Sequence, residues 1–135
     1  LEATLILYDD PDRAVHSIPA LRLLTRPAPE IRALAERLTP AYAAAVGEAF
    51  SVSVDDCQSQ IGSGALPVDL LPSAALVARP VAARGKGRAL QRLAAALRAL
   101  PRPVVGRIAD DALWLDLRCL EDETGFAAQL KELAP

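Results

Sequence analysis

Residues 104–118 read VVGRIADDALWLDLR, and their pattern predicts a β-hairpin. Two apolar runs, residues 104–108 and 113–118, flank the connection Ala109-Asp110-Asp111-Ala112, as expected for strands joined by four residues. Alternate positions of the second run carry the leucines that would face a core: Leu113, Leu115 and Leu117. The hairpin therefore favours an antiparallel sheet with one buried face.

Two further strands and three helices are predicted around this hairpin. The strands are residues 51–55, which alternate in polarity, and residues 73–79, which end at Pro80. Apolar residues at helical spacing predict helices over residues 31–45, from Leu90 to Leu100, and over about residues 122–133. Pro40 is expected to kink the first helix or to restart it, and Gly47 to end it. The fold class that buries the apolar faces of these helices and strands is α+β, a small, mainly antiparallel sheet with helices packed on one face.

Composition narrows the possible functions. The 135 residues suffice for one domain, and a 52% hydrophobic content with a net charge of −2 excludes a disordered chain. The same charge argues against a free-standing nucleic-acid binder. No apolar run approaches the roughly 20 residues that cross a bilayer, and no secretory leader opens the chain, so a cytoplasmic protein without a membrane partner is expected. Cys57 and Cys119 suit no zinc spacing and are expected to be reduced thiols.

The beginning of the sequence predicts a piece of a larger enzyme. The chain has no methionine and opens with LEATLILY, an apolar helical pattern that no capping residue precedes. Residues 1–16 are therefore expected to be a truncated helix and linker, and residues 17–135 the domain that follows them.

The most unusual segment is SQIGSGALP, residues 59–67. Its glycines free the backbone to turn sharply or to approach another group, and polar side chains cluster beside them. The candidate residues for a cleft or interface loop are Ser59, Gln60, Gly62, Ser63 and Gly64. An ordinary structural loop is the alternative, because a phosphate-binding pattern would need a third glycine and a following helix.

Basic residues supply two weaker candidates. Arg107 and Arg118 lie on the predicted hairpin, where either could bind an anion at an interface. The alternative is a cross-strand ion pair between Arg107 and Asp116. Residues 83–88 form a predicted basic loop that could touch RNA phosphate or simply be solvated.

No catalytic, cofactor-binding or metal-binding residue is assigned. His16, the one histidine, has no partners at metal-ligand spacing. A Schiff-base lysine requires a desolvated amine. Lys86 is predicted in a polar loop and Lys131 on the open side of a helix, so neither fits that role.

Four segments in register resemble one family. They are IPALRLLTR at 18–26, SQIGSGALP at 59–67, LPSAAL at 71–76, and VVGRI at 104–108 followed by LWLDLRCLEDE at 113–123. Their order and spacing resemble the carboxy-terminal part of the bacterial selenocysteine synthases, the L-seryl-tRNA(Sec) selenium transferases. The resemblance covers essentially the whole chain.

This resemblance implies a fold-type-I enzyme that depends on pyridoxal phosphate. Such enzymes convert seryl-tRNA(Sec) to selenocysteinyl-tRNA(Sec), with selenophosphate as the selenium donor, and the cofactor acts as electron sink. Members of the family resemble one another in forming large rings of dimers, and they bind tRNA chiefly through a separate amino-terminal domain. These properties imply a homo-oligomer in which the small domain contacts the large domain and neighbouring subunits.

The resemblance also implies that this chain is inactive alone. The family's cofactor lysine, and the arginines thought to bind the selenium donor, belong to the large domain that precedes residue 1. The chain would then correspond to the small domain that closes over the cofactor cleft, and would itself bind no cofactor. Two alternatives stay open: an RNA- or protein-binding module that uses Arg84, Lys86 and Arg88, and the small domain of another fold-type-I enzyme acting on free amino acids.

Overall fold

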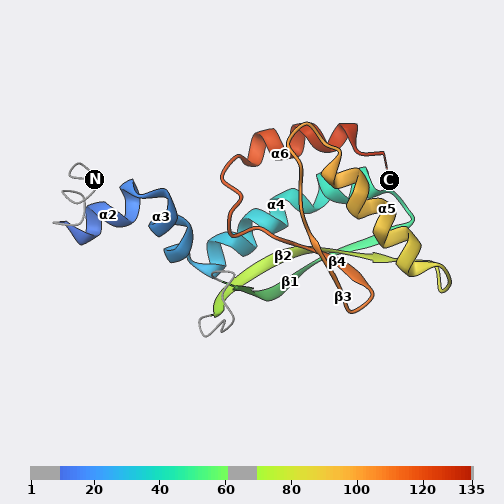
Figure 1. The fold of residues 1–135 in the computed structure, drawn as a ribbon, viewed down its shortest axis with the longest axis horizontal. Coiled ribbons are helices and arrows are strands. Elements are labelled where there is room, and N and C mark those ends of the chain that lie inside the picture. The colour runs from blue at the N-terminus through green and yellow to red at the C-terminus, as the bar shows by residue number, and fades with distance from the viewer. Residues whose placement is uncertain (1–9, 61–69, 135) are drawn as a thin grey trace.

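The computed structural model describes residues 10–60 and 70–134, and these form an α+β fold. Figure 1 shows the elements in chain order. The helices are α2 (Pro11–Ser17), α3 (Pro19–Thr25), α4 (Ala28–Val46), α5 (Lys86–Arg98), α6 (Glu123–Gln129) and the short 3-10 helix η2 (Leu130–Glu132). The strands are β1 (Phe50–Gln60), β2 (Leu70–Pro80), β3 (Arg107–Ala109) and β4 (Ala112–Asp116).

The four strands form one antiparallel sheet in the order β1-β2-β4-β3. The long pair β1–β2 runs from Phe50 opposite Pro80 to Gln60 opposite Leu70. Both strands are longer than the predicted ranges 51–55 and 73–79, because backbone pairing continues through the polar residues of β1. Ser59 and Gln60 therefore lie on a strand, and the prediction of a loop at these two residues was wrong.

The predicted hairpin is confirmed, but its connection is shorter than expected. Ala109 pairs with Ala112, so only Asp110 and Asp111 form the turn. Both have positive φ angles, 52° and 55°, as a two-residue type I′ turn requires. Such a turn matches the right-handed twist of the strands, which explains why two residues, and not four, are enough to join β3 to β4.

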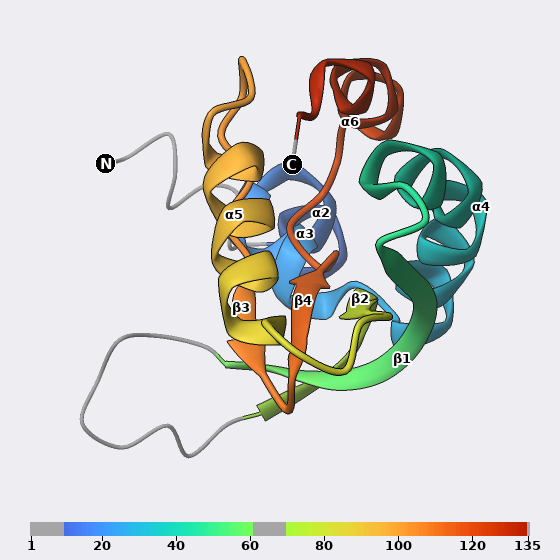
Figure 2. The ribbon, with the colours of Figure 1, turned by 90° about the vertical axis from the view of Figure 1, so that its right-hand side faces the viewer.

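One face of the sheet carries the helices. Figure 2 shows α4, α5 and α6 on the same side of the strands. The core between them is mainly aliphatic and includes Ile31, Leu34 and Leu38 from α4, Leu76 from β2, Leu93 and Leu97 from α5, Leu113, Leu115 and Leu117 from the β4 segment, and Phe126 from α6. This arrangement confirms the predicted fold class.

Helix α4 runs without interruption past Pro40, where a kink or restart was predicted. It ends at Gly47, whose φ of 71° and backbone N–H bond to the Ala43 carbonyl form the expected C-cap. Helix α5 begins at Lys86, directly after Gly85 in the left-handed region (φ 75°). Lys86 and Arg88 thus belong to the first turn of a helix, and the predicted basic loop is limited to the residues before Lys86.

Helices α2 and α3 extend from one end of the molecule (Figure 1). Asp10 caps α2 by accepting a hydrogen bond from the Arg13 backbone N–H at 3.1 Å. Residues 20–24, an apolar run in the sequence, form most of α3, which buries none of its residues fully. Helix α3 therefore packs against α2 and contributes no fully buried residue to the core.

Candidate functional site

A hollow of about 400 Å³ lies where α3 meets the end of the sheet. We call it the α3 hollow. It is lined by Ala20, Leu23, Leu24, Ser59, Gln60, Asp116, Arg118 and Cys119. Three predicted site residues thus meet here, namely Ser59, Gln60 and Arg118. Gly62, Ser63 and Gly64, predicted for the same site, lie outside the described residues.

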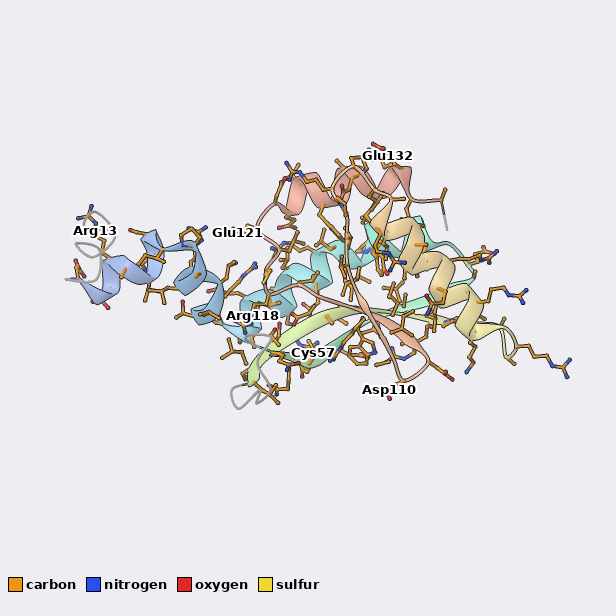
Figure 3. The ribbon with its side chains drawn as sticks, in the orientation of Figure 1. Arg13, Cys57, Asp110, Arg118, Glu121 and Glu132 are labelled. Atoms are coloured by element: carbon orange, nitrogen blue, oxygen red, sulfur yellow. The ribbon has the colours of Figure 1, made fainter. Side chains whose placement is uncertain are left out.

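Arg118 organises this end of the molecule (Figure 3). Its side chain comes from the residues just after β4 and is only 5% exposed. The guanidinium donates to the Ser59 hydroxyl and to backbone carbonyls of α3, of the residue after α3, and of β2. The bonds are Nε to Ser59 Oγ (3.2 Å), Nη1 to the carbonyls of Leu23 (3.0 Å), Leu24 (3.1 Å) and Arg26 (3.0 Å), and Nη2 to the carbonyl of Pro72. With every nitrogen engaged, Arg118 positions backbone and is not free to bind an anion.

Arg26 makes the reciprocal contact. Its Nη1 donates to the carbonyls of Leu117 (3.4 Å), Arg118 (3.3 Å) and Leu120 (2.7 Å). Each arginine therefore binds carbonyls in the segment that carries the other. We call Arg26, Arg118 and these carbonyls the arginine clamp. The clamp therefore attaches α3 and the residue after it to the end of the sheet.

Asp116 completes the polar cluster. Its carboxylate accepts hydrogen bonds from Ser59 Oγ (2.5 Å), Ser73 Oγ (2.6 Å) and the Arg118 backbone N–H (3.0 Å). Ser59 both donates to Asp116 and accepts from Arg118, so it links the two charged side chains. Sequence reasoning considered Asp116 only as a partner of Arg107. The alternation along β4, which places Asp116 and Arg118 on the same side, was the available signal for this cluster.

The α3 hollow offers no complete set of catalytic groups among its described lining residues. It combines hydroxyl, carboxylate and guanidinium groups with the exposed thiol of Cys119, but has neither a lysine nor a histidine. The nearby Cys57 thiol is half-buried, and burial, followed by the charge of Asp116, raises its pKa to about 11. A thiol with that pKa stays protonated near neutral pH and is a poor nucleophile.

Arg107 lies away from this hollow. The strand register places it opposite Trp114, and its guanidinium lies 5.5 Å from the centre of the indole ring. Arg79 approaches the same ring at 5.7 Å while also bonding Asp55 at 2.6 Å. The predicted alternative of an Arg107–Asp116 ion pair does not form in the described structure, and Arg107 instead makes a cation–π contact.

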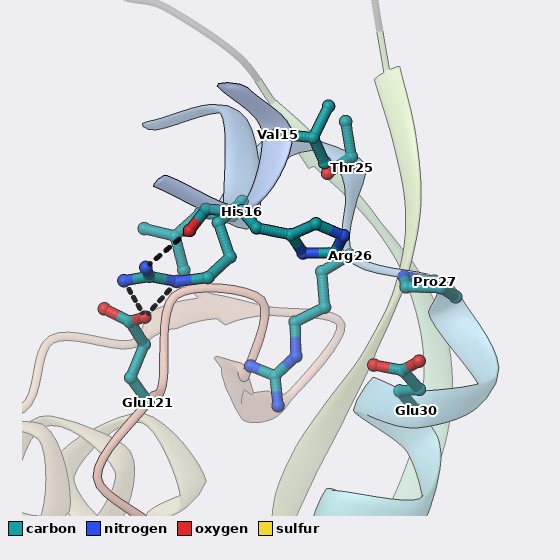
Figure 4. Close-up of a pocket in the computed structure, with 9 residues that line it drawn as sticks. Val15, His16, Thr25, Arg26, Pro27, Glu30 and Glu121 are labelled. Carbon is teal, nitrogen blue, oxygen red and sulfur yellow. Dashed lines mark hydrogen bonds and ion pairs between the residues drawn. The ribbon is translucent and has the colours of Figure 1, made fainter. Parts of the chain in front are cut away.

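A second hollow, of about 500 Å³, surrounds His16 between α2, α3 and α4 (Figure 4). Arg22 bonds Glu121 at 2.6 Å and the His16 carbonyl at 3.3 Å, which ties α3 to the segment before α6. The carboxylate of Glu30 faces the same hollow (Figure 4). Among residues 10–60 and 70–134, no group of three or more His, Cys, Asp or Glu side chains could hold a metal ion.

The two lysines of the chain do not fit a covalent cofactor site. Lys86 lies 3.2 Å from Asp111 in an exposed ion pair, and Lys131 is exposed. An aldimine-forming lysine needs an amine removed from water, and both of these amines are accessible to solvent. The residues present therefore do not fit pyridoxal phosphate as a covalently held group.

No helix in the described part of the chain has the length and apolar character to span a membrane. Together, a sheet covered by helices on one face and a hollow where α3 meets the end of that sheet define the class: a small α+β domain with a polar cluster of Ser59, Asp116 and Arg118 at one end.

Comparison with known proteins gives the family. Residues 1–121 match the model of SelA, L-seryl-tRNA selenium transferase, and the chain belongs to this family. It is 62% identical over 130 residues to an L-seryl-tRNA(Sec) selenium transferase of Klebsiella pneumoniae, which covers 96% of the chain and 28% of the relative. Identity to the corresponding proteins of Methylocella silvestris and Yersinia pestis is 56%, over 98% and 99% of the chain and 28% of each relative. The chain thus spans little more than a quarter of the length of these relatives.

Proposed function

We propose that this chain is the carboxy-terminal small domain of an enzyme that converts seryl-tRNA(Sec) to selenocysteinyl-tRNA(Sec) with selenophosphate. The observation that carries the proposal is the 56–62% identity to selenium transferases over nearly the whole chain. In this proposal the intact enzyme depends on pyridoxal phosphate, acts in the cytoplasm as a homo-oligomer, and binds neither metal nor membrane.

The proposal assigns the chemistry to residues outside this chain. Pyridoxal phosphate supplies an electron sink when bound, but the exposed positions of Lys86 and Lys131 do not suit attachment to it. No step of the reaction is therefore assigned to a residue of this chain. Residues 17–135 would act as the cover of a cleft whose reactive groups lie on a preceding large domain, and the chain alone would be inactive.

Within this role, the arginine clamp would fix the shape of the surface presented to the large domain or to a neighbouring subunit. Arg118 positions α3 against the end of the sheet through bonds to the carbonyls of Leu23 and Leu24. Ser59 and Gln60 lie at that same end. The hydrogen bonds of the clamp support a preformed contact surface, since buried and satisfied polar groups specify a single arrangement.

Reduction with borohydride tests the proposal. The 135-residue chain and the complete gene product are each mixed with pyridoxal phosphate, reduced, and mapped by mass spectrometry. We expect a pyridoxyl-lysine in the complete gene product outside the residues described here, and none at Lys86 or Lys131. Lys86→Arg and Lys131→Arg variants provide controls for non-specific labelling.

Two outcomes would overturn this assignment. Stoichiometric labelling of Lys86 or Lys131 would place the cofactor on this chain, as would turnover of seryl-tRNA(Sec) by the 135 residues alone. Conversion of free serine in preference to seryl-tRNA(Sec) by the complete gene product would instead indicate an enzyme of free amino acids.

A further inference from the structure

Positive charge is concentrated in one part of the chain. Residues 70–109 contain eight Lys or Arg and no Asp or Glu, although the whole chain has a net charge of −2. The other residues therefore carry a net charge of −10 by difference. An uneven distribution of this size produces a local positive potential that the overall charge conceals.

The fold gathers part of this charge at the beginning of α5. Arg84, Arg88 and Arg92 recur every four residues, and we call them the cationic row. Together with Lys86 they line an open hollow of about 620 Å³ beside the exposed Val81. Figure 3 shows nitrogen-tipped side chains projecting outward along α5 and the loop before it.

Acidic groups neutralise little of the cationic row. Lys86 is bound to Asp111 at 3.2 Å, and Glu48 is the acidic residue that lines the hollow. Arg84, Arg88 and Arg92 are all exposed and form no ion pair with a carboxylate of the described residues. Elsewhere in the described residues, the exposed Arg22, Arg37 and Arg102 each bond a carboxylate, whereas Arg13, Arg98 and Arg107 form no ion pair but do not gather around one hollow. The cationic row is therefore available to an external anion.

Helix energetics alone do not account for this row. Acidic residues in the first turn would favour the helix dipole, yet α5 has none there and Gly85 gives no side-chain cap. Like charges four residues apart, as at Arg88 and Arg92, disfavour a helix by a few tenths of a kcal/mol. The charges thus oppose α5 slightly, which favours a role in binding over a role in stability.

The spacing favours a polymeric anion. Arg88 and Arg92 are separated by about one helical turn, roughly 6 Å along the axis, and Arg84 extends the row beyond the helix. An open hollow bordered by separate guanidinium groups suits a chain of phosphates better than one small anion.

We propose that the cationic row of Arg84, Arg88 and Arg92 binds the phosphate backbone of the tRNA substrate. This inference rests on the proposed function, because that function supplies an RNA polyanion as partner. The contact is to phosphate and would carry no base specificity.

The test measures binding of unacylated tRNA(Sec) by the complete gene product at several salt concentrations. Replacing all three arginines (Arg84→Gln, Arg88→Gln and Arg92→Gln) should lower affinity on the order of tenfold or more near 0.1 M salt. The slope of log affinity against log salt should decrease in magnitude by about 2–3. The matched control is the triple variant Arg22→Gln, Arg37→Gln and Arg102→Gln, which removes the same charge from ion-paired sites and should leave the slope unchanged.

The outcomes separate the two proposals. If the unmodified protein binds and converts seryl-tRNA(Sec), but replacement of the cationic row changes neither affinity nor slope, this inference fails while the proposed function stands. An equal loss of slope in both triple variants would show a general charge effect and would also overturn it. If the row binds poly-glutamate as tightly as tRNA, its partner is an acidic protein surface and the RNA assignment is wrong. A protein that neither binds nor converts seryl-tRNA(Sec) would refute the proposed function itself.

Discussion

Arginines occupy two contrasting environments in this molecule. In the arginine clamp, Arg118 is 5% exposed and all its nitrogens donate to protein oxygens. In the cationic row, Arg84, Arg88 and Arg92 are exposed and pair with no described carboxylate. A buried guanidinium that is fully hydrogen-bonded stabilises the fold, whereas an exposed one remains available for phosphate. The surroundings of an arginine, and not its presence, therefore indicate its role.

The largest expected effect comes from removing the buried side of this comparison. Arg118→Met leaves the carbonyls of Leu23, Leu24 and Pro72 without their donor. Loss of these charge-assisted, partly buried hydrogen bonds should lower the free energy of local opening by on the order of 2–3 kcal/mol. Hydrogen exchange of residues 20–26 measures this opening.

Arg107→Met is the matched control, because the Arg107 side chain is exposed and stacks on an indole face without an ion pair in the described structure. This substitution should lower the free energy of local opening at residues 20–26 by about 1 kcal/mol or less. If residues 20–26 were equally protected from hydrogen exchange in Arg118→Met and Arg107→Met, contacts other than the clamp would keep α3 in place.

Arg26→Met should have an intermediate effect of about 1–2 kcal/mol on the same exchange, since Arg26 is only partly buried. The two arginines bind each other's backbone segments. The double variant Arg26→Met with Arg118→Met should therefore lower the free energy of local opening by less than the sum of the two single effects. Strict additivity in this cycle would contradict the reciprocal arrangement.

A smaller effect should appear at alkaline pH beside the clamp. Burial raises the pKa of Cys57 to about 11, above the ordinary value of 9.0. The unfolded thiol therefore loses its proton first, and stability should fall as pH rises from 9 to 11. The expected loss is about 1 kcal/mol, because solvent screening of a half-buried thiol reduces the full linkage value.

Cys57→Ala isolates this effect when its unfolding free energy is compared with that of the unmodified protein across the same pH range. The subtraction removes the contribution of Tyr42, whose pKa burial also raises. A difference that stays constant from pH 9 to pH 11 would argue against a buried neutral thiol.

The smallest effect on stability should come from the cationic row. Replacing Arg84, Arg88 and Arg92 with glutamine breaks no ion pair of the described structure and relieves a like-charge contact in α5. The unfolding free energy should change by about 0.5 kcal/mol or less in either direction. A loss above 2 kcal/mol would make the row structural and would remove the contrast with the clamp.

Local patterns allowed much of the fold to be predicted. Apolar residues at helical spacing gave α4 and α5, and alternating leucines gave the buried face of the hairpin. The polar half of β1 could not be recognised, because its strand conformation depends on pairing with β2 and not on its own side chains. The two-residue turn was missed because Asp110 and Asp111 adopt positive φ without a glycine.

The candidate site was predicted only in part, for a physical reason. The acceptors of Arg118 are mostly backbone carbonyls of residues more than 90 positions earlier in the chain. Every residue has a carbonyl, so no side-chain pattern marks such partners. Ser59, Gln60 and Arg118 were placed in one candidate site and do meet, whereas Arg107 pairs with Trp114 instead.

The contrast between the two groups of arginines is tested most directly by the salt dependence of tRNA(Sec) binding. Binding is measured for the unmodified complete gene product, for its Arg26→Met variant, and for the variant in which all three arginines of the cationic row are replaced by glutamine. We predict an unchanged slope for Arg26→Met and a slope about 2–3 smaller in magnitude for the triple variant. The reverse result, with the slope altered by Arg26→Met and unaffected by the triple variant, would contradict the division of roles between clamp and row.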